Sequence, residues 1–153
     1  MTASSILRSP FFAAAIFAAV VFGGTPWLVY SIGLWAAGGL PEPPKTIAPA
    51  DAQREVWGTL LGVGEPSLDP LTPYTYLAKL ENPGEERPGL LASYTVASDH
   101  LLAHRRFEGR QWWSLSNASL VIWLSRNWTI EQILSKLIEM RSSRQSTPAE
   151  APR

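Results

Sequence analysis

The sequence contains no cysteine. Disulfide bonds, thiolate metal sites and cysteine nucleophiles are therefore excluded. A small domain without covalent cross-links needs a well-filled apolar core, and seven Trp, five Phe and four Tyr residues supply bulky side chains for one. The lack of cysteine by itself leaves the cellular compartment open.

Net charge is also lacking, since 13 basic residues balance 13 acidic ones. No affinity for polyanions follows from this balance, and we expect no nucleic acid partner. The sequence has no Gly-rich phosphate loop, no nucleotide-binding fingerprint, no Ser-His-Asp arrangement and no placed pair of carboxylates. These absences favour a protein that is not an enzyme and that carries neither a cofactor nor a metal.

Charged side chains are missing altogether from Pro10 to Leu40. About 20 apolar residues are enough for a helix that crosses a bilayer, so this run predicts one N-terminal transmembrane helix near Phe11–Tyr30. The run is longer than the apolar part of a cleavable signal peptide, which favours an uncleaved anchor. Pro26 lacks an N–H group and is expected to kink the helix or end it.

The charges on either side of the run predict its orientation. Arg8 and the amino terminus precede it, whereas Glu42, Lys45 and Asp51 follow it. The positive-inside rule then places the N-terminus in the cytoplasm of a bacterium and the remaining chain in the periplasm. We therefore expect a single-pass inner-membrane protein with a periplasmic domain, and the inverted topology is the alternative.

Ala15, Ala19 and Gly23 lie four residues apart and share one face of this helix. Small residues at that spacing let a second helix approach closely. They predict packing of the membrane helix against another one, in a homo-oligomer or with a partner protein. Alanine-rich segments also produce such stripes by chance, which is the competing interpretation.

Composition divides the chain into four regions. Residues 1–40 are the N-terminal tail and anchor, 41–49 a Pro-rich spacer, 50–141 a helical domain, and 142–153 a disordered tail. Hydrophobic periodicity predicts about five helices in the domain and no strands. The expected fold class is therefore all-α, with one transmembrane helix and a small helical domain.

Three helices of the domain have distinct patterns. The apolar segment Trp112–Asn127 is expected to be the central helix. Thr129 and Gln132 have the spacing of a capping box and predict the start of the next one. Its expected buried face is Ile130, Ile133, Leu134, Leu137 and Ile138. A helix from Pro88 to about Arg106 is expected to bury Leu91, Tyr94, Leu101 and Leu102.

His100 and His104 are four residues apart, so on a helix they could reach one metal ion. The sequence indicates no third ligand. Histidines that are satisfied by neighbouring protein groups are therefore the favoured interpretation, and we predict no metal site.

A basic and aromatic segment follows the histidines. It contains Arg105, Arg106, Phe107, Arg110, Trp112 and Trp113. Guanidinium groups bind phosphate and other anions, and the rings stack on flat ligands, so the segment is a candidate contact for an anionic ligand or a glycan. The competing interpretation is a solvated turn between two helices, with both tryptophans in the core.

The segment Ser119–Asn127 resembles a signature helix of the bacterial peptidoglycan glycosyltransferases, the glycan-polymerising domain of penicillin-binding proteins. That family reads Thr-Ile-Thr-Gln-Gln-Leu-Ala-Arg-Asn, and Leu124, Arg126 and Asn127 match it. Residues 129–137 are similar to a later helix of the family. The resemblance covers less than a fifth of the chain. For that part it implies a lysozyme-like arrangement of helices.

The residues that depart from that family bear on catalysis. Both glutamines of its signature helix are missing, and Ser98 stands beside Asp99 where the family has its catalytic Glu. The resemblance therefore implies a non-catalytic relative. The whole chain is also similar to small bacterial inner-membrane proteins that have one span and a Trp-rich helical domain.

These patterns lead to two functional hypotheses. The preferred one is a membrane-anchored, non-catalytic protein whose helical domain binds a partner or supports an envelope complex. The alternative is an envelope protein that binds glycan or lipid-linked phosphate through residues 105–113.

Overall fold

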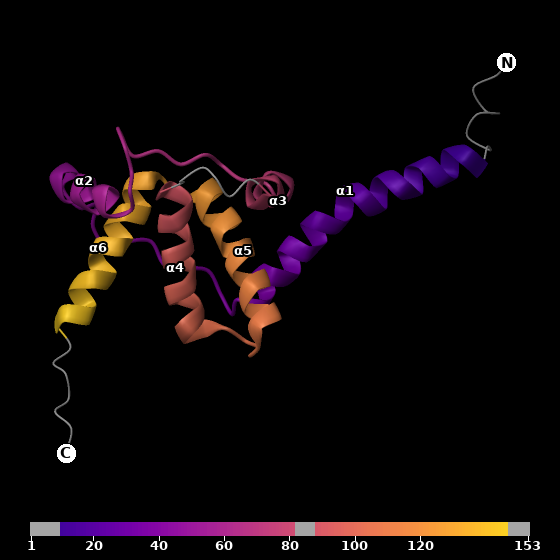
Figure 1. Ribbon diagram of the computed structural model, residues 1–153. Helices are drawn as coiled ribbons and strands as arrows, with labels where there is room; N and C mark the ends of the chain where they lie inside the picture. The colour runs from indigo at the N-terminus through magenta and orange to yellow at the C-terminus, as the bar shows by residue number, and fades with distance from the viewer. Residues whose placement is uncertain (1–9, 82–87, 147–153) are drawn as a thin grey trace.

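The computed structural model describes residues 10–81 and 88–146, without the side chains of residues 10–13, 16, 19, 80, 81 and 146. Within that part of the chain all regular structure is helical, as the periodicity predicts (Figure 1). The helices are α1 (Pro10–Ala36), α2 (Ala50–Thr59), α3 (Pro73–Glu81), α4 (Pro88–His104), α5 (Arg110–Asn127) and α6 (Ile130–Ser146).

The predicted transmembrane helix is wrong. Among the residues that the structure describes, no helix combines the length and the apolar character that crossing a membrane requires. The predictions of a single-pass inner-membrane protein and of a periplasmic domain behind an anchor rested on that helix, and they are contradicted with it. α1 also continues through Pro26 to Ala36 instead of ending at the proline.

The physical reason lies in what the second half of the apolar run packs against. α1 makes its most extensive contacts with α5. Ala36 and Ala37 are completely buried, and a β-carbon at Gly33 would overlap the hydroxyl of Ser119 on α5. The residues from about Gly33 onward therefore belong to the core of the helical domain. The interpretation of the whole uncharged run as one membrane anchor did not predict this.

The first half of α1 extends away from the other helices (Figure 1). Several of its large apolar side chains are exposed to solvent, with Phe17 at 71% and Phe22 at 78% of their full accessible surface. α1 is thus divided between a domain helix and a projecting arm. Both parts come from the same uncharged run.

α5 is the central helix, as predicted, and packs on α1, α3 and α4. Leu120, Val121 and Leu124 are completely buried in it. Four polar residues of α5 are buried as well, namely Ser116, Asn117, Ser119 and Ser125, because neighbouring helices cover most of its surface.

The prediction for the buried face of α4 is wrong for three of its four residues. Leu91, Tyr94 and Leu102 are exposed, and only Leu101 is buried. The face that meets its neighbours is made mainly of small residues, namely Gly89, Ala92, Ser93, Val96 and Ala97. Small residues allow the close approach of α4 to α5, and the larger side chains then point outward.

The capping box at the start of α6 is confirmed. The Thr129 N–H donates to Gln132 Oε1 at 2.9 Å, and the Gln132 N–H donates to Thr129 Oγ1 at 3.4 Å. The predicted face of α6 is also largely confirmed. Ile130, Ile133, Leu134 and Leu137 are buried, and Ile138 is half-buried.

The Pro-rich segment 41–49 is held along α6. The Lys45 N–H donates to Glu139 Oε2 at 3.0 Å, and the Ala48 N–H donates to Ser135 Oγ at 2.9 Å. At the other end of the chain, α6 continues to Ser146, and residues 147–153 of the predicted tail lie outside the described residues.

Candidate functional site

The turn between α4 and α5 is fastened to the C-terminal end of α1. Gly38 has a φ of +81°, and a β-carbon there would overlap the carbonyl oxygen of His104. The Arg106 N–H donates to the Ala36 carbonyl at 3.0 Å. This contact brings Trp35, near the end of α1, beside residues that lie about seventy positions later in the sequence.

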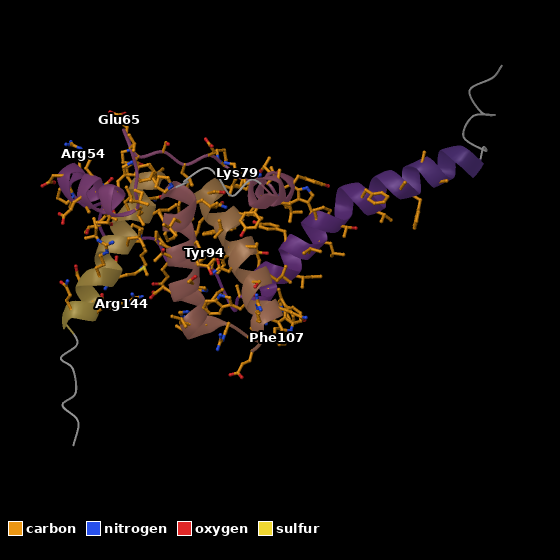
Figure 2. All side chains as sticks on the ribbon, in the orientation of Figure 1. Arg54, Glu65, Lys79, Tyr94, Phe107 and Arg144 are labelled. Carbon is orange, nitrogen blue, oxygen red and sulfur yellow. The ribbon has the colours of Figure 1, made fainter. Side chains whose placement is uncertain are left out.

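Three aromatic side chains form a row at this end of the domain. Trp35 contacts Phe107 with ring centroids 5.2 Å apart and planes tilted by 49°. Phe107 stacks on Trp112 with centroids 4.9 Å apart and planes at 29°. Trp35 is 55% exposed and Trp112 is 36% exposed. Figure 2 shows Phe107 at the foot of α5, where α1 also ends.

Arginines flank this row. The Arg105 guanidinium lies 5.4 Å from the centroid of the Trp113 ring, and that of Arg106 lies 5.4 Å from the Trp35 ring. Arg110 is exposed at the first residue of α5. Among the described residues, no ion pair involves any of these three arginines. Their charges are therefore available to a ligand.

The N-terminus of α5 adds backbone donors. Gly109 precedes the helix and has no side chain, so no capping hydrogen bond reaches the first N–H groups of α5. A β-carbon at Gly109 would meet nothing within 4 Å, so there is open space beside Gly109 itself. Glu108, exposed in the same turn, is the carboxylate nearest in sequence. We call this set, made of Trp35, Arg105, Arg106, Phe107, Arg110, Trp112 and Trp113, the aromatic–arginine cluster.

Of the six residues that the sequence singles out in segment 105–113, five make the ring contacts described above, and Arg110 lies at the start of α5 beside them in sequence. The competing interpretation, with both tryptophans in the core, does not hold for Trp112, which stays partly exposed. Sequence reasoning missed Trp35 as a member of the cluster. No local signal could have found it, because its neighbours come from a distant part of the chain.

His100 and His104 form a separate feature on α4. Their rings stack with centroids 4.4 Å apart, beside a cavity of about 380 Å³ between α4, α6 and the segment after α1. His100 Nε2 is 3.2 Å from the Gly39 carbonyl, and His104 Nδ1 is 3.1 Å from the His100 carbonyl. Within the described residues no group of three potential metal ligands occurs. Backbone carbonyls therefore satisfy these histidines, which do not form a metal site with the rest of the described chain.

The pKa of His100 is lowered from its ordinary value. Burial of the imidazole is the largest cause, and the neighbouring His104 acts in the same direction. The Gly39 carbonyl and Asp99 act in the opposite direction. The neutral form of His100 is therefore favoured in the folded protein.

A second surface is an apolar groove of about 620 Å³ between α1, α3 and α5. None of its lining residues carries a formal charge. They are Val21, Phe22, Thr25, Pro26, Val29, Tyr30, Pro73, Tyr76, Leu77, Ser114, Leu115, Ala118, Ser119 and Ile122. Burial raises the pKa of Tyr30 and of Tyr76, consistent with these apolar surroundings. We call it the α1 groove.

The predicted packing stripe lies on the projecting arm of α1. Ala15 and Gly23 are exposed, and a β-carbon at Gly23 would meet nothing within 4 Å. The side chain of Ala19 lies outside the described residues. Among described groups, the Tyr74 hydroxyl on α3 donates to the Gly23 carbonyl. Packing of another helix on the stripe stays a prediction.

Comparison with protein families, with curated proteins and with solved structures finds no match for this chain. The resemblance to the peptidoglycan glycosyltransferases therefore stays a prediction. Function is inferred below from the two surfaces alone.

Proposed function

We propose that this chain is a non-catalytic interaction protein that self-associates through α1. Each copy lays the apolar arm of its α1 over the α1 groove of the other. The observation that carries the proposal is one uncharged apolar surface, formed by the arm and the groove, which no described segment of the chain covers.

The exposure of this surface is costly in water. Large contiguous apolar patches are uncommon on monomeric proteins and mark sites of association. On the arm alone, Phe17, Val20 and Phe22 each expose more than 60% of their surface. At about 25 cal/mol per Å² of apolar surface removed from water, covering side chains of this size favours association.

Charge and symmetry argue for a second copy as the partner. The part of α1 from Phe17 to Ile32, which includes most of the arm and the residues that border the groove, has no charged residue, and neither has the rest of the groove lining. An uncharged groove favours an uncharged apolar helix, and this chain itself carries one. α1 both borders the groove and projects beyond it. In a dimer with a two-fold axis, the arm of each copy can therefore cover the groove of the other.

Sedimentation equilibrium tests the proposal, because a dimer has twice the mass of the single chain. Leu77 lines the groove and is 54% exposed, whereas Leu102 on α4 is 69% exposed and lies outside it. Leu77→Glu is expected to shift the equilibrium to monomer, and Leu102→Glu is expected to leave the dimer unchanged. Circular dichroism verifies that both variants keep their helices.

Cross-linking gives a second readout in a chain without native cysteine. A single Phe22→Cys substitution is expected to yield a covalent dimer with a short bis-maleimide reagent, and Leu102→Cys is expected to yield none. A wild-type chain that stays monomeric at micromolar concentrations would overturn the proposal. So would uptake into lipid vesicles without any self-association.

A further inference from the structure

We propose that the aromatic–arginine cluster binds a phosphorylated sugar. The phosphate is held by Arg106, Arg110 and the uncapped N–H groups at the start of α5, and the sugar ring lies on the exposed face of Trp112. This site is independent of the self-association through the α1 groove.

Two independent features at the cluster select an anion. Arg105, Arg106 and Arg110 have no ion-pair partner among the described residues, so three positive charges share one end of the domain. The first N–H groups of α5, a helix of 18 residues, have no capping side chain, and there is open space beside Gly109, which precedes them. Uncapped N–H groups at a helix N-terminus and guanidinium groups both bind phosphate in proteins. Glu108 opposes an anion in the same turn, one negative charge against three positive ones.

The aromatic row provides the second half of the site. Its rings hold one another in place, with Phe107 packed between Trp35 and Trp112. A rigid exposed ring face adjacent to bound phosphate suits a ligand that presents a flat apolar face beside its charge, as the C–H face of a sugar does.

The geometry favours a sugar over a nucleotide base. Bases are commonly held by stacking against rings together with hydrogen bonds to their edges. Here the centroid spacings of 5.2 Å and 4.9 Å leave no slot between rings into which a base could insert. The outer faces remain, and one of them is already shared with the Arg106 guanidinium.

The site is a binding site and not a catalytic one. Glycosyl and phosphoryl transfer need a positioned acid, a base or a metal next to the reacting bond. None of the residues of the cluster is acidic, and the carboxylate nearest to it in sequence, Glu108, is exposed.

Isothermal titration calorimetry with four probes tests this inference on the 153-residue chain. The probes are glucose 1-phosphate, glucose, inorganic phosphate and adenosine monophosphate. Glucose 1-phosphate is expected to bind about fivefold more tightly than inorganic phosphate, since the ring contact adds to the phosphate contact. It is expected to bind more tightly than adenosine monophosphate, and glucose alone is expected to bind weakly.

Two sets of variants test which residues contact the phosphate and which contact the sugar. Arg106→Ala combined with Arg110→Ala is expected to weaken both phosphate and glucose 1-phosphate by about tenfold or more. The backbone hydrogen bond from residue 106 to Ala36 is kept in that variant. Trp112→Leu is expected to weaken glucose 1-phosphate while leaving phosphate unchanged.

A matched control carries the same change in net charge. Figure 2 labels Arg54 on α2 and Arg144 on α6 to the left of Phe107, away from the foot of α5. Arg54→Ala combined with Arg144→Ala is expected to bind glucose 1-phosphate like the wild type. Leu77→Glu, which tests self-association, is also expected to keep this binding.

Four results would overturn the inference. They are no binding of glucose 1-phosphate, equal affinity for inorganic phosphate, tighter binding of adenosine monophosphate, and wild-type affinity in a folded Arg106→Ala, Arg110→Ala variant. Circular dichroism of each variant establishes folding independently of binding.

Discussion

Gly33 of α1 lies so close to Ser119 of α5 that a β-carbon at position 33 would overlap the serine hydroxyl. The same β-carbon would stand 2.9 Å from the Leu115 carbonyl oxygen, which is backbone and cannot rotate away. Because of this close contact, the second half of the uncharged run packs against α5 and forms part of the domain core. The contact also sets the position of Trp35, two residues further along α1.

Gly33→Ala is expected to destabilise the fold, although alanine is the better helix former. The gain in helix propensity is about 1 kcal/mol, and overpacking a tight contact costs about 1–3 kcal/mol. Because the obstacle includes a backbone carbonyl, we expect the cost to prevail. Urea unfolding at one fixed protein concentration measures the difference.

The matched control is Gly24→Ala in the same helix, where an added β-carbon meets nothing within 4 Å. That variant is expected to be as stable as the wild type or more stable by up to about 1 kcal/mol. A Gly33→Ala variant that gains stability as Gly24→Ala does would contradict the close packing of α1 on α5.

Thr129→Ala removes the acceptor of one hydrogen bond in the capping box of α6. The Gln132 N–H loses its partner at the helix start, and we expect a loss of about 1 kcal/mol in the free energy of unfolding. Thr129→Ser keeps the hydroxyl and is expected to retain most of the stability. If the alanine and serine variants melted at the same temperature, the cap would not be contributing.

Acidification is expected to lower stability in a range set by His100. Its pKa is lowered in the folded state, mainly by burial and then by His104, so below about pH 6.5 the unfolded chain takes up this proton first. The free energy of unfolding should therefore fall from about pH 6.5 downward and level off once the folded state is protonated as well.

His100→Gln tests this assignment by chemical denaturation between pH 7 and pH 5. The variant is expected to show a flatter profile than the wild type over that range. The carboxyl groups of Glu131 and Glu139 have lowered pKa values, so their contribution is lost only at more acidic pH. An unchanged slope in His100→Gln would show that other groups dominate the pH dependence.

The local sequence pattern was sufficient to predict those features of the helices that depend on residues close together in the chain. The cap formed by Thr129 and Gln132 depends on residues three apart, and the burial of α5 is indicated by its uninterrupted apolar run over residues 120–124. These features can be read from sequence because the interacting groups lie within one or two helical turns of each other.

The sequence by itself determined that residues 10–40 lack charge, that the domain is helical and that residues 105–113 concentrate arginines and rings. Tertiary structure decided what those residues contact. It turned the end of the uncharged run into a core helix and placed Trp35 beside Phe107. The physical reason is that apolar burial is non-directional, so an apolar run indicates that it will leave water and not which surface will cover it.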